Sequence, residues 1–243
     1  MKKIHNIISL AIIFVREALR EPGWMFWSLA FPSILVVTLF LNGNGALDDR
    51  LYGVLLGFIA IVTGLRGTGT YMLGRREAGF LKAFVAFRAA QRRFLAAQII
   101  SGFIFTYGVV LIFSLVLSFT PGSLGLFDFL GMAIRSVPVV LCVGLSSCIL
   151  NLIPMKFQRV FGVMSMSFAP MLLLAMARVN FGDEVAWVVW INYFNPVSIG
   201  AEIIDPAGRV EWPTLLICVI LSVLSVFLTL SKFSTETYWD KEG

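Results

Sequence analysis

Charged residues and histidine are scarce in this 243-residue sequence. Charged residues make up 14% of the chain and hydrophobic residues 58%, which leaves too little polar surface for a soluble globular protein. The single histidine, His5, has no acidic residue beside it. The three cysteines, Cys142, Cys148 and Cys218, lie in apolar runs and match no metal-ligand spacing. We therefore expect a membrane protein without a metal site, a disulfide framework or histidine-based catalysis.

A phosphate-binding loop is also absent from the sequence. No Gly-x-x-x-x-Gly-Lys-Ser/Thr run occurs anywhere, so the chain has no usual means of holding nucleotide phosphates. The apolar runs carry no paired acidic residues, which a membrane-embedded enzyme acting on lipids would need. The sequence therefore predicts that this chain is not itself an enzyme and holds no cofactor.

What the sequence does have is a series of apolar runs long enough to cross a bilayer. The hydrocarbon core of a membrane takes roughly 20 apolar residues per helix. The predicted spans are 24–41, 51–73, 95–119, 127–152, 160–177 and 212–230. Pro32 predicts a kink in the first of them. We expect a single all-α transmembrane domain over residues 1–243, with six spans.

The first 21 residues predict a helix that lies along the membrane surface. Their apolar residues follow one helical stripe, and Arg16, Glu17, Arg20 and Glu21 come after the apolar part without a small-residue cleavage site. This pattern describes an interfacial elbow helix rather than a signal peptide.

The basic residues predict the orientation of the chain. One side of the predicted topology carries Lys2, Lys3, Arg16, Arg20, the six basic residues of 75–93, Lys156, Arg159, Lys232 and Lys241, whereas the other carries Arg50, Arg178 and Arg209. Positive residues accumulate on the cytoplasmic side, so both termini are expected there. The net charge of +5 comes from these basic residues beside the spans, and we therefore do not expect a nucleic-acid partner.

The segment 75–93, RREAGFLKAFVAFRAAQRR, separates the second span from the third. It has six basic residues against one acid, Glu77, and Phe80, Phe84 and Phe87 recur at helical spacing. This pattern predicts a short basic helix with an aromatic face, with Glu77 near the positive end of its dipole. Such a helix can dock on a lipid surface or in the groove of a soluble partner, and we favour the partner.

The segment 178–211 is too long for a turn and too polar for a span. Residues 186–194, AWVVWINYF, are apolar but too few to cross the bilayer, and Asn195-Pro196 follows them directly. We expect a broken pair of short helices in the outer leaflet, with Glu202 and Asp205 lining an outward vestibule. An ordinary amphipathic outer loop is the alternative.

Arg66 and Arg135 lie within predicted spans. An arginine inside the bilayer is costly and usually faces a cavity or a partner, although both side chains are near enough to a membrane surface to reach it. The sequence leaves open whether they line a substrate pathway or have a structural role. Gly53-x-x-x-Gly57 permits close helix approach, of the kind seen at dimer faces.

Three motifs in this order resemble the membrane subunits of type-2 ATP-binding-cassette (ABC) exporters. Residues 16–32, REALREPGWMFWSLAFP, resemble the entry segment of that family, in which an elbow helix leads into a proline-containing first span. Residues 77–86, EAGFLKAFVA, are similar to the Glu-x-Gly-x-Leu segment that follows the second span. NPVSIGAE matches the Asn-Pro pattern after the short outer helix. Where many members have a later proline, this chain has Arg88, so the end of the helix is left open.

The resemblance implies a permease subunit of an ATP-driven exporter in the bacterial cytoplasmic (inner) membrane. Two such subunits, identical or related, would enclose the pathway, contact membrane lipids and bind two copies of a separate ATPase that carries ATP and magnesium. The substrate would be an amphiphilic, lipid-like, glycan, drug or peptide molecule moved outward. The implied ATPase-coupling residues are Glu77, Gly79, Phe80, Leu81, Phe84, Phe87 and Arg88, and the implied pathway residues are Arg66, Arg135, Asn195, Pro196 and Glu202.

A passive channel or a transporter driven by an ion gradient is the main alternative. Such a protein typically has an inverted repeat with broken helices in both halves. Here a broken segment is predicted in one half only, which favours the exporter subunit.

Overall fold

The computed structural model describes residues 2–21, 26–42, 49–81, 87–119, 125–181, 185–205 and 212–232. These residues form helices joined by turns, and no strand occurs among them. The helices are α1 (Lys2–Arg20), η1 (Phe26–Ala30), α3 (Phe31–Asn42), α4 (Asp49–Gly64), η2 (Leu65–Thr70), α5 (Tyr71–Glu77), α7 (Arg88–Ser118), α8 (Leu126–Ser147), η3 (Cys148–Leu152), α9 (Phe157–Phe181), α10 (Ala186–Asn192), α11 (Pro196–Ile204) and α12 (Trp212–Ser231). The predicted all-α class is confirmed for this part of the chain.

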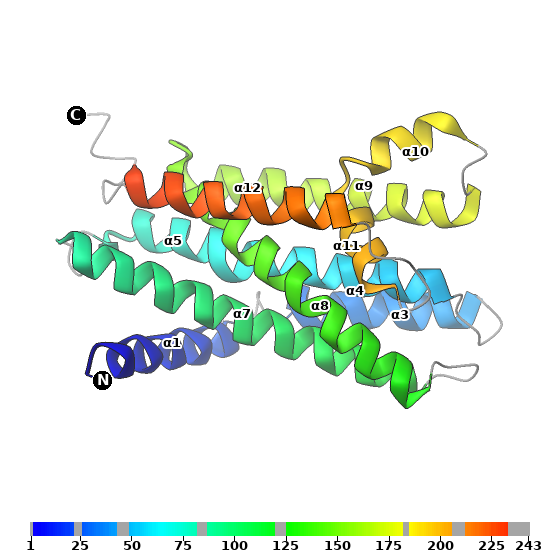
Figure 1. The fold of residues 1–243 in the computed structure, drawn as a ribbon, viewed down its shortest axis with the longest axis horizontal. Helices are drawn as coiled ribbons and strands as arrows, with labels where there is room; N and C mark the ends of the chain where they lie inside the picture. The colour runs from blue at the N-terminus through cyan, green and yellow to red at the C-terminus, as the bar shows by residue number, and fades with distance from the viewer. Residues whose placement is uncertain are drawn as a thin grey trace.

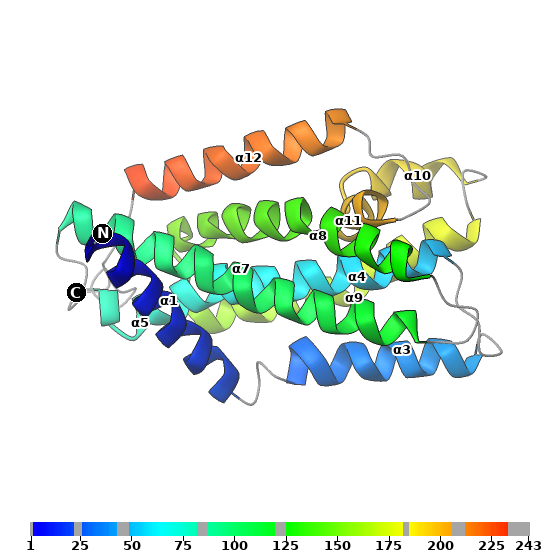
Figure 2. The ribbon, with the colours of Figure 1, turned by 60° about the horizontal axis from the view of Figure 1, so that its bottom comes forward.

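Five helical stretches are long and apolar enough to cross a membrane, so the chain is a helical membrane protein. They are Arg50–Glu77, Arg88–Ser118, Phe127–Leu152, Phe157–Phe181 and Trp212–Ser231. The predicted first span corresponds to η1 and α3, whose apolar stretch Ser28–Thr38 is shorter than the others. In Figure 2, α3 runs along the same bundle as these stretches. Residues 22–25 and 43–48, on either side of it, lie outside the described residues.

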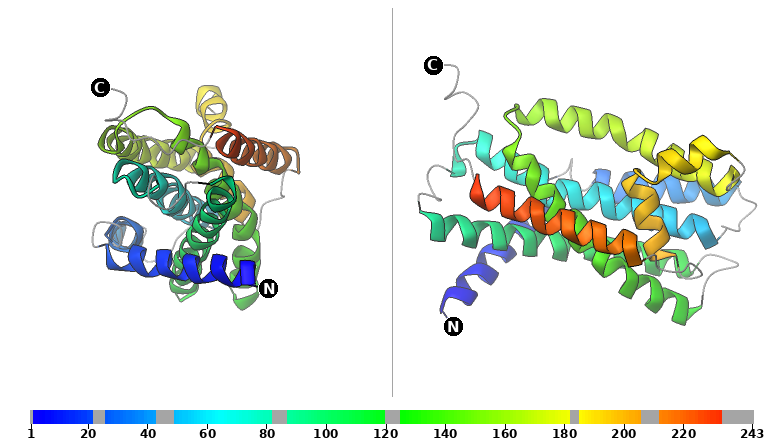
Figure 3. Two further views of the ribbon diagram at one scale, coloured as in Figure 1. Left: turned by 90° about the vertical axis from the view of Figure 1, so that its left-hand side faces the viewer. Right: turned by 45° about the horizontal axis from the view of Figure 1, so that its top comes forward.

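The helices form an elongated bundle with two distinct ends (Figure 1). One end holds α1, α5, the start of α7 and the end of α12, whereas α10 and α11 lie toward the other. Viewed along the bundle, α1 crosses it rather than running with the spans (Figure 3). This orientation is the one expected of an interfacial helix, and its position at the membrane surface stays a prediction.

The second span is the most buried of the candidate spans, and it lies at the centre of the bundle (Figure 2). Two glycines in α4 let α11 approach its backbone. A Cβ atom on Gly53 would lie 2.8 Å from the carbonyl oxygen of Ala201, and one on Gly57 would lie 2.8 Å from the Ala201 nitrogen. The Gly53-x-x-x-Gly57 face is therefore occupied within this chain, which corrects its interpretation as a dimer face.

Two π-helical turns interrupt the regular helices. The first, η1, ends two residues before Pro32, which has no backbone N–H to donate and whose ring crowds the preceding turn. The irregularity thus lies where the sequence predicted a kink. The second, η2, has the sequence LRGTGT and lies inside the second span, where it carries Arg66. Nothing in the sequence pattern had predicted it.

Candidate functional site

The segment 75–93 is not one helix, contrary to the sequence-based expectation. Its first three residues, Arg75 to Glu77, form the last turn of α5, and α7 begins at Arg88. Gly79 adopts a φ of 72°, in the left-handed region that ends helices and that favours glycine. The basic residues are therefore divided between the ends of two spans. Residues 82–86, with Lys82 and Phe84, lie outside the described residues.

Residues 77–81 lead out of α5, and we call them the coupling turn after the role that the sequence resemblance implies; Ala78 and Gly79 form the turn, and Phe80 and Leu81 are helical again. The Ala78 nitrogen donates to the Gly74 carbonyl at 2.9 Å, and the Gly79 nitrogen donates to the Arg76 carbonyl at 3.0 Å, so the turn closes the helix. Leu81 is fully buried in an apolar cluster contributed by α1, α5, α7 and η3. The coupling turn therefore belongs to a cluster that joins these helices.

The predicted aromatic face of this segment is divided in the structure. Phe80 packs inward against Phe94 of α7, with 6.3 Å between ring centroids. Phe87 points away from the protein and is 77% exposed. Phe80 is helical, but Phe87 has extended backbone as the N-cap of α7, with φ −120° and ψ 146°, so helical spacing does not continue to Phe87.

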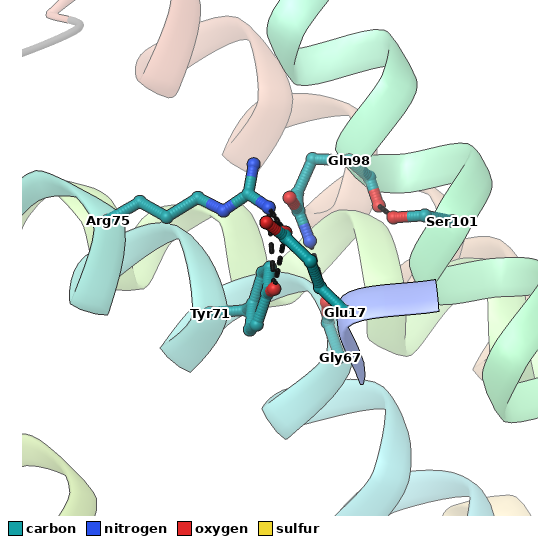
Figure 4. A network of polar contacts seen from close by, with 6 residues as sticks. All are labelled: Glu17, Gly67, Tyr71, Arg75, Gln98 and Ser101. Carbon is teal, nitrogen blue, oxygen red and sulfur yellow. Dashed lines mark hydrogen bonds and ion pairs between the residues drawn. The ribbon is translucent and has the colours of Figure 1, made fainter. Parts of the chain in front are cut away.

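Arg75 is held inside the protein rather than displayed on a docking surface, with only 10% of its side chain exposed. Its Nη2 donates to a Glu17 carboxylate oxygen of α1 and, at 3.3 Å, to the Tyr71 hydroxyl, which itself donates to Glu17 at 2.8 Å (Figure 4). The centre of the guanidinium group lies 3.6 Å from the ring centroid of Phe14, 4.6 Å from Tyr71, 5.0 Å from Phe80 and 5.9 Å from Phe94. Arg75 thus ties the crossing helix α1 to the end of the second span.

Arg76 also points inward, where it satisfies carbonyl groups at the end of η3. Its Nη1 donates to the Asn151 carbonyl at 2.6 Å, and its Nη2 donates to the Ile153 and Met155 carbonyls at 3.1 Å each. An ion pair of 3.6 Å joins Arg76 to Glu77. Glu77 is the last residue of α5, so the prediction that it stands at the start of a helix is wrong.

The same end of the bundle holds a buried hydrogen bond across two spans. Gln98 of α7 donates its side-chain nitrogen to the Gly67 carbonyl in η2 at 2.8 Å (Figure 4). A π-helical turn displaces backbone carbonyls from the regular pattern, and a glutamine amide from a neighbouring helix satisfies one of them here. The third span is thereby fastened to the second close to the Arg75 contacts.

At the opposite end, the predicted break at Asn195-Pro196 is present. It separates α10 from α11, with Asn195 as the N-cap and Pro196 in the first turn of α11. The Asn195 Oδ1 atom accepts from the Val197 nitrogen at 3.1 Å, and its Nδ2 donates to the Met171 carbonyl of α9 at 2.7 Å. The cap therefore also fixes the break against the fifth span.

Sequence reasoning missed Asn192, which joins this polar network. Its Nδ2 donates to the Leu174 carbonyl at 3.0 Å and to the Val188 carbonyl at 2.8 Å. Its Oδ1 accepts from Asn195 at 3.2 Å and from the Ser198 hydroxyl. The available signal was one amide residue within an otherwise apolar and aromatic run, because a buried amide requires hydrogen-bond partners.

A cavity of about 330 Å³ lies beside this network, and we call it the vestibule. Its polar walls come from Arg50, Arg178, Ser198, Glu202 and Asp205, with apolar groups of Val54, Ala175, Val179 and Ala201 between them. Glu202 and Asp205 thus line a common cavity, as the sequence predicted. An ion pair between Arg178 and Glu202 connects α9 with α11 across it. That the vestibule faces outward stays a prediction.

The two arginines predicted within spans have different surroundings. Arg135 donates to the Asp205 carbonyl at the end of α11, next to the vestibule. Arg66 is fully buried, donates to the Ser165 hydroxyl at 3.1 Å, and stacks on Phe161 and Phe168 of α9 at 4.7 and 5.5 Å. Arg66 therefore links the second and fifth spans, and neither arginine lines the vestibule. A pathway role for either stays a prediction.

A known protein of similar length resembles this chain over nearly its whole length. No family model matches the chain. The chain is 23% identical over 241 residues to Protein McbE of Escherichia coli, an alignment that covers 97% of this chain and 99% of that protein. The similarity therefore extends over the spans and both ends of the bundle.

Among the described residues, no group of three or more histidine, cysteine, aspartate or glutamate residues is placed to hold a metal ion.

Proposed function

We propose that the chain is the membrane-spanning permease subunit of an ATP-driven ABC exporter. It would move an amphiphilic, lipid-like, glycan, drug or peptide substrate from the cytoplasm or the inner leaflet outward. A second permease subunit and two copies of a separate ATPase would complete the complex. The absence of a phosphate-binding loop supports this division, with ATP and magnesium held by the ATPase.

One observation carries the proposal. A continuous helical segment, α4, η2 and α5, begins at the vestibule with Arg50 and Val54 and ends at the coupling turn with Glu77. A displacement of the coupling turn by a soluble partner is therefore transmitted along this buried segment to the walls of the vestibule. Rigid packed elements of this kind carry motion between distant sites.

Several structural features suit the coupling turn to such a contact. It lies at the same end as the start of α1 and the end of α12, away from α10 and α11 (Figure 1). Leu81 anchors it to the apolar cluster, and Arg75 and Arg76 fasten the preceding helical turn to α1 and η3. A push on this turn consequently moves helices rather than bending a loop.

The proposal is tested by co-expression with the candidate ATPase from a neighbouring reading frame. We expect the tagged chain to co-purify that ATPase, and the complex to hydrolyse ATP while the pure chain does not. Glu77→Lys places a positive charge at the coupling turn and should weaken co-purification more than Glu77→Gln does. Hydrolysis by the pure chain, or unchanged co-purification for Glu77→Lys, would contradict the proposal.

A further inference from the structure

A groove with a charged side and an apolar side lies between the start of α7 and the end of α12. Its volume is about 440 Å³, and it is lined by Arg88, Gln91, Arg92, Phe227, Leu230 and Ser231. Figures 1 and 2 and the right-hand view of Figure 3 show these two helix ends at the same end of the bundle. Because one candidate span begins here and another ends here, we expect the groove at the level where the chain leaves the apolar part of the membrane.

The charged side of the groove is built for an anion. Arg88 and Arg92 are one helical turn apart, so both guanidinium groups lie on one face of α7. Both side chains are exposed, and neither forms an ion pair with any carboxylate in the described ranges. The first turn of α7 contains no acidic residue, so two positive charges stand at the positive end of a 31-residue helix. A bound anion would relieve this unfavourable arrangement.

The apolar side of the groove favours a ligand with a hydrocarbon part over a simple inorganic anion. Phe227 is 65% exposed and Leu230 is 38% exposed, and both belong to the last turns of α12. The volume of the groove lies in the range of small-molecule sites and exceeds the needs of one phosphate group. A ligand that carries a phosphate and a hydrocarbon chain fits both sides of the groove.

We propose that this groove binds an anionic phospholipid of the membrane. Arg88 and Arg92 hold the phosphodiester and the headgroup, and Phe227 and Leu230 contact the first methylene groups of an acyl chain. Arg88 is thereby assigned to a lipid and not to the ATPase contact implied by the sequence resemblance. The lipid lies against both α7 and α12 and joins the third span to the sixth at this end of the bundle.

Native mass spectrometry of the purified chain tests the proposal without the ATPase. Phosphatidylglycerol is titrated onto the detergent-solubilised protein, and the lipid-bound fraction gives the apparent Kd. The Arg88→Gln/Arg92→Gln variant should bind about 30-fold more weakly, because two basic contacts to an anionic lipid are lost. Phosphatidylcholine should bind the wild-type chain more weakly than phosphatidylglycerol.

Arg93 provides the matched control. It neighbours Arg92 and is likewise exposed, but it does not line the groove, and its Nε donates to the Ala89 carbonyl at 3.1 Å. We expect Arg92→Gln to weaken phosphatidylglycerol binding about fivefold and Arg93→Gln to change it less than about twofold. Equal effects of the two variants would show that only net charge matters and would overturn the proposal.

Two further outcomes also decide the question. Inorganic phosphate should not displace phosphatidylglycerol at equal concentration, because phosphate lacks the chain that contacts Phe227. Displacement by phosphate would replace the lipid site with a soluble-anion site. If the Arg88→Gln/Arg92→Gln variant kept full lipid affinity but lost co-purification of the ATPase, the groove would belong to the ATPase contact instead.

Discussion

Arg178, in the last turn of α9, forms an ion pair with Glu202 of α11 on the wall of the vestibule. The two side chains are 24% and 33% exposed, so solvent screens their attraction only in part. The pair connects the fifth span to the helix that packs on Gly53 and Gly57 of the second span. Any opening of the vestibule between α9 and α11 has to break this contact.

The first prediction is the strength of that ion pair. A double-mutant cycle with Arg178→Gln and Glu202→Gln should give a coupling energy of about 0.5 to 1 kcal/mol at low salt. The reversed pair, Arg178→Glu with Glu202→Arg, should recover most of the stability lost in either single charge reversal. Thermal unfolding of the purified variants measures both quantities. The coupling should decrease in 1 M salt, and a coupling that is indifferent to salt would contradict the electrostatic explanation.

The second prediction concerns the backbone at Gly79. A Cβ atom there meets nothing within 4 Å, so Gly79→Ala tests the left-handed conformation alone. We expect a loss of about 1 kcal/mol in the free energy of unfolding. Gly108→Ala is the control, because its Cβ also meets nothing and it lies inside α7, where alanine is favoured by about 1 kcal/mol. Equal effects at the two sites would show that the conformation of Gly79 costs nothing.

The third prediction concerns Arg75 and the crossing helix α1. Arg75→Leu removes the contacts with Glu17 and Tyr71 and the stacking on Phe14, so we expect a loss of about 2 kcal/mol in stability. Arg75→Lys keeps the charge but not the planar stacking, and its loss should be smaller. Arg16→Gln, an exposed change on α1, serves as the control and should have little effect. Stability of the Arg75→Leu variant equal to that of the control would show that Arg75 does not fasten α1.

The fourth prediction uses two phenylalanines of equal exposure at opposite ends of the third span. Phe87 is 77% exposed at the start of α7, and Phe119 is 78% exposed at its other end. Phe87→Ala should weaken co-purification of the ATPase, with a loss on the order of 2 kcal/mol, because exposed aromatic anchors dominate small interfaces. Phe119→Ala should leave co-purification unchanged. If the two variants behave alike, Phe87 is not part of the contact.

The fifth prediction concerns topology. Single cysteines at Ala89 and Trp187, in a chain without Cys142, Cys148 and Cys218, report the two ends of the bundle. An impermeant thiol reagent added outside intact cells should label the Trp187 position and leave the Ala89 position unlabelled. The reverse pattern would invert the predicted orientation of the chain.

Local patterns in the sequence were sufficient for most of the fold. Apolar runs bounded by polar turns predicted the later spans within about four residues, because hydropathy depends only on neighbouring residues. The start of the third span is the exception, because the helix extends back through basic residues to Arg88. Asn195-Pro196 predicted the break between α10 and α11, since proline removes a backbone donor and asparagine caps the next helix. The cavity shared by Glu202 and Asp205 followed from the short segment that carries both residues.

The candidate site depended on contacts between distant residues, which a single sequence does not reveal. Arg75 and Arg76 were interpreted as surface charges, but their partners are Glu17 and the carbonyl of Asn151, far away in the chain. Helical spacing also failed at Phe87, because this residue has extended backbone as the N-cap of α7.

The close fit of α11 against α4 limits where another membrane helix can pack on this chain. The second span has almost no exposed surface, because its small residues already receive a short helix of the same chain. The fifth and sixth spans keep most of their surface exposed within one chain. A second subunit that meets this one inside the bilayer therefore cannot pack on the second span, and the fifth and sixth spans offer it the largest exposed share.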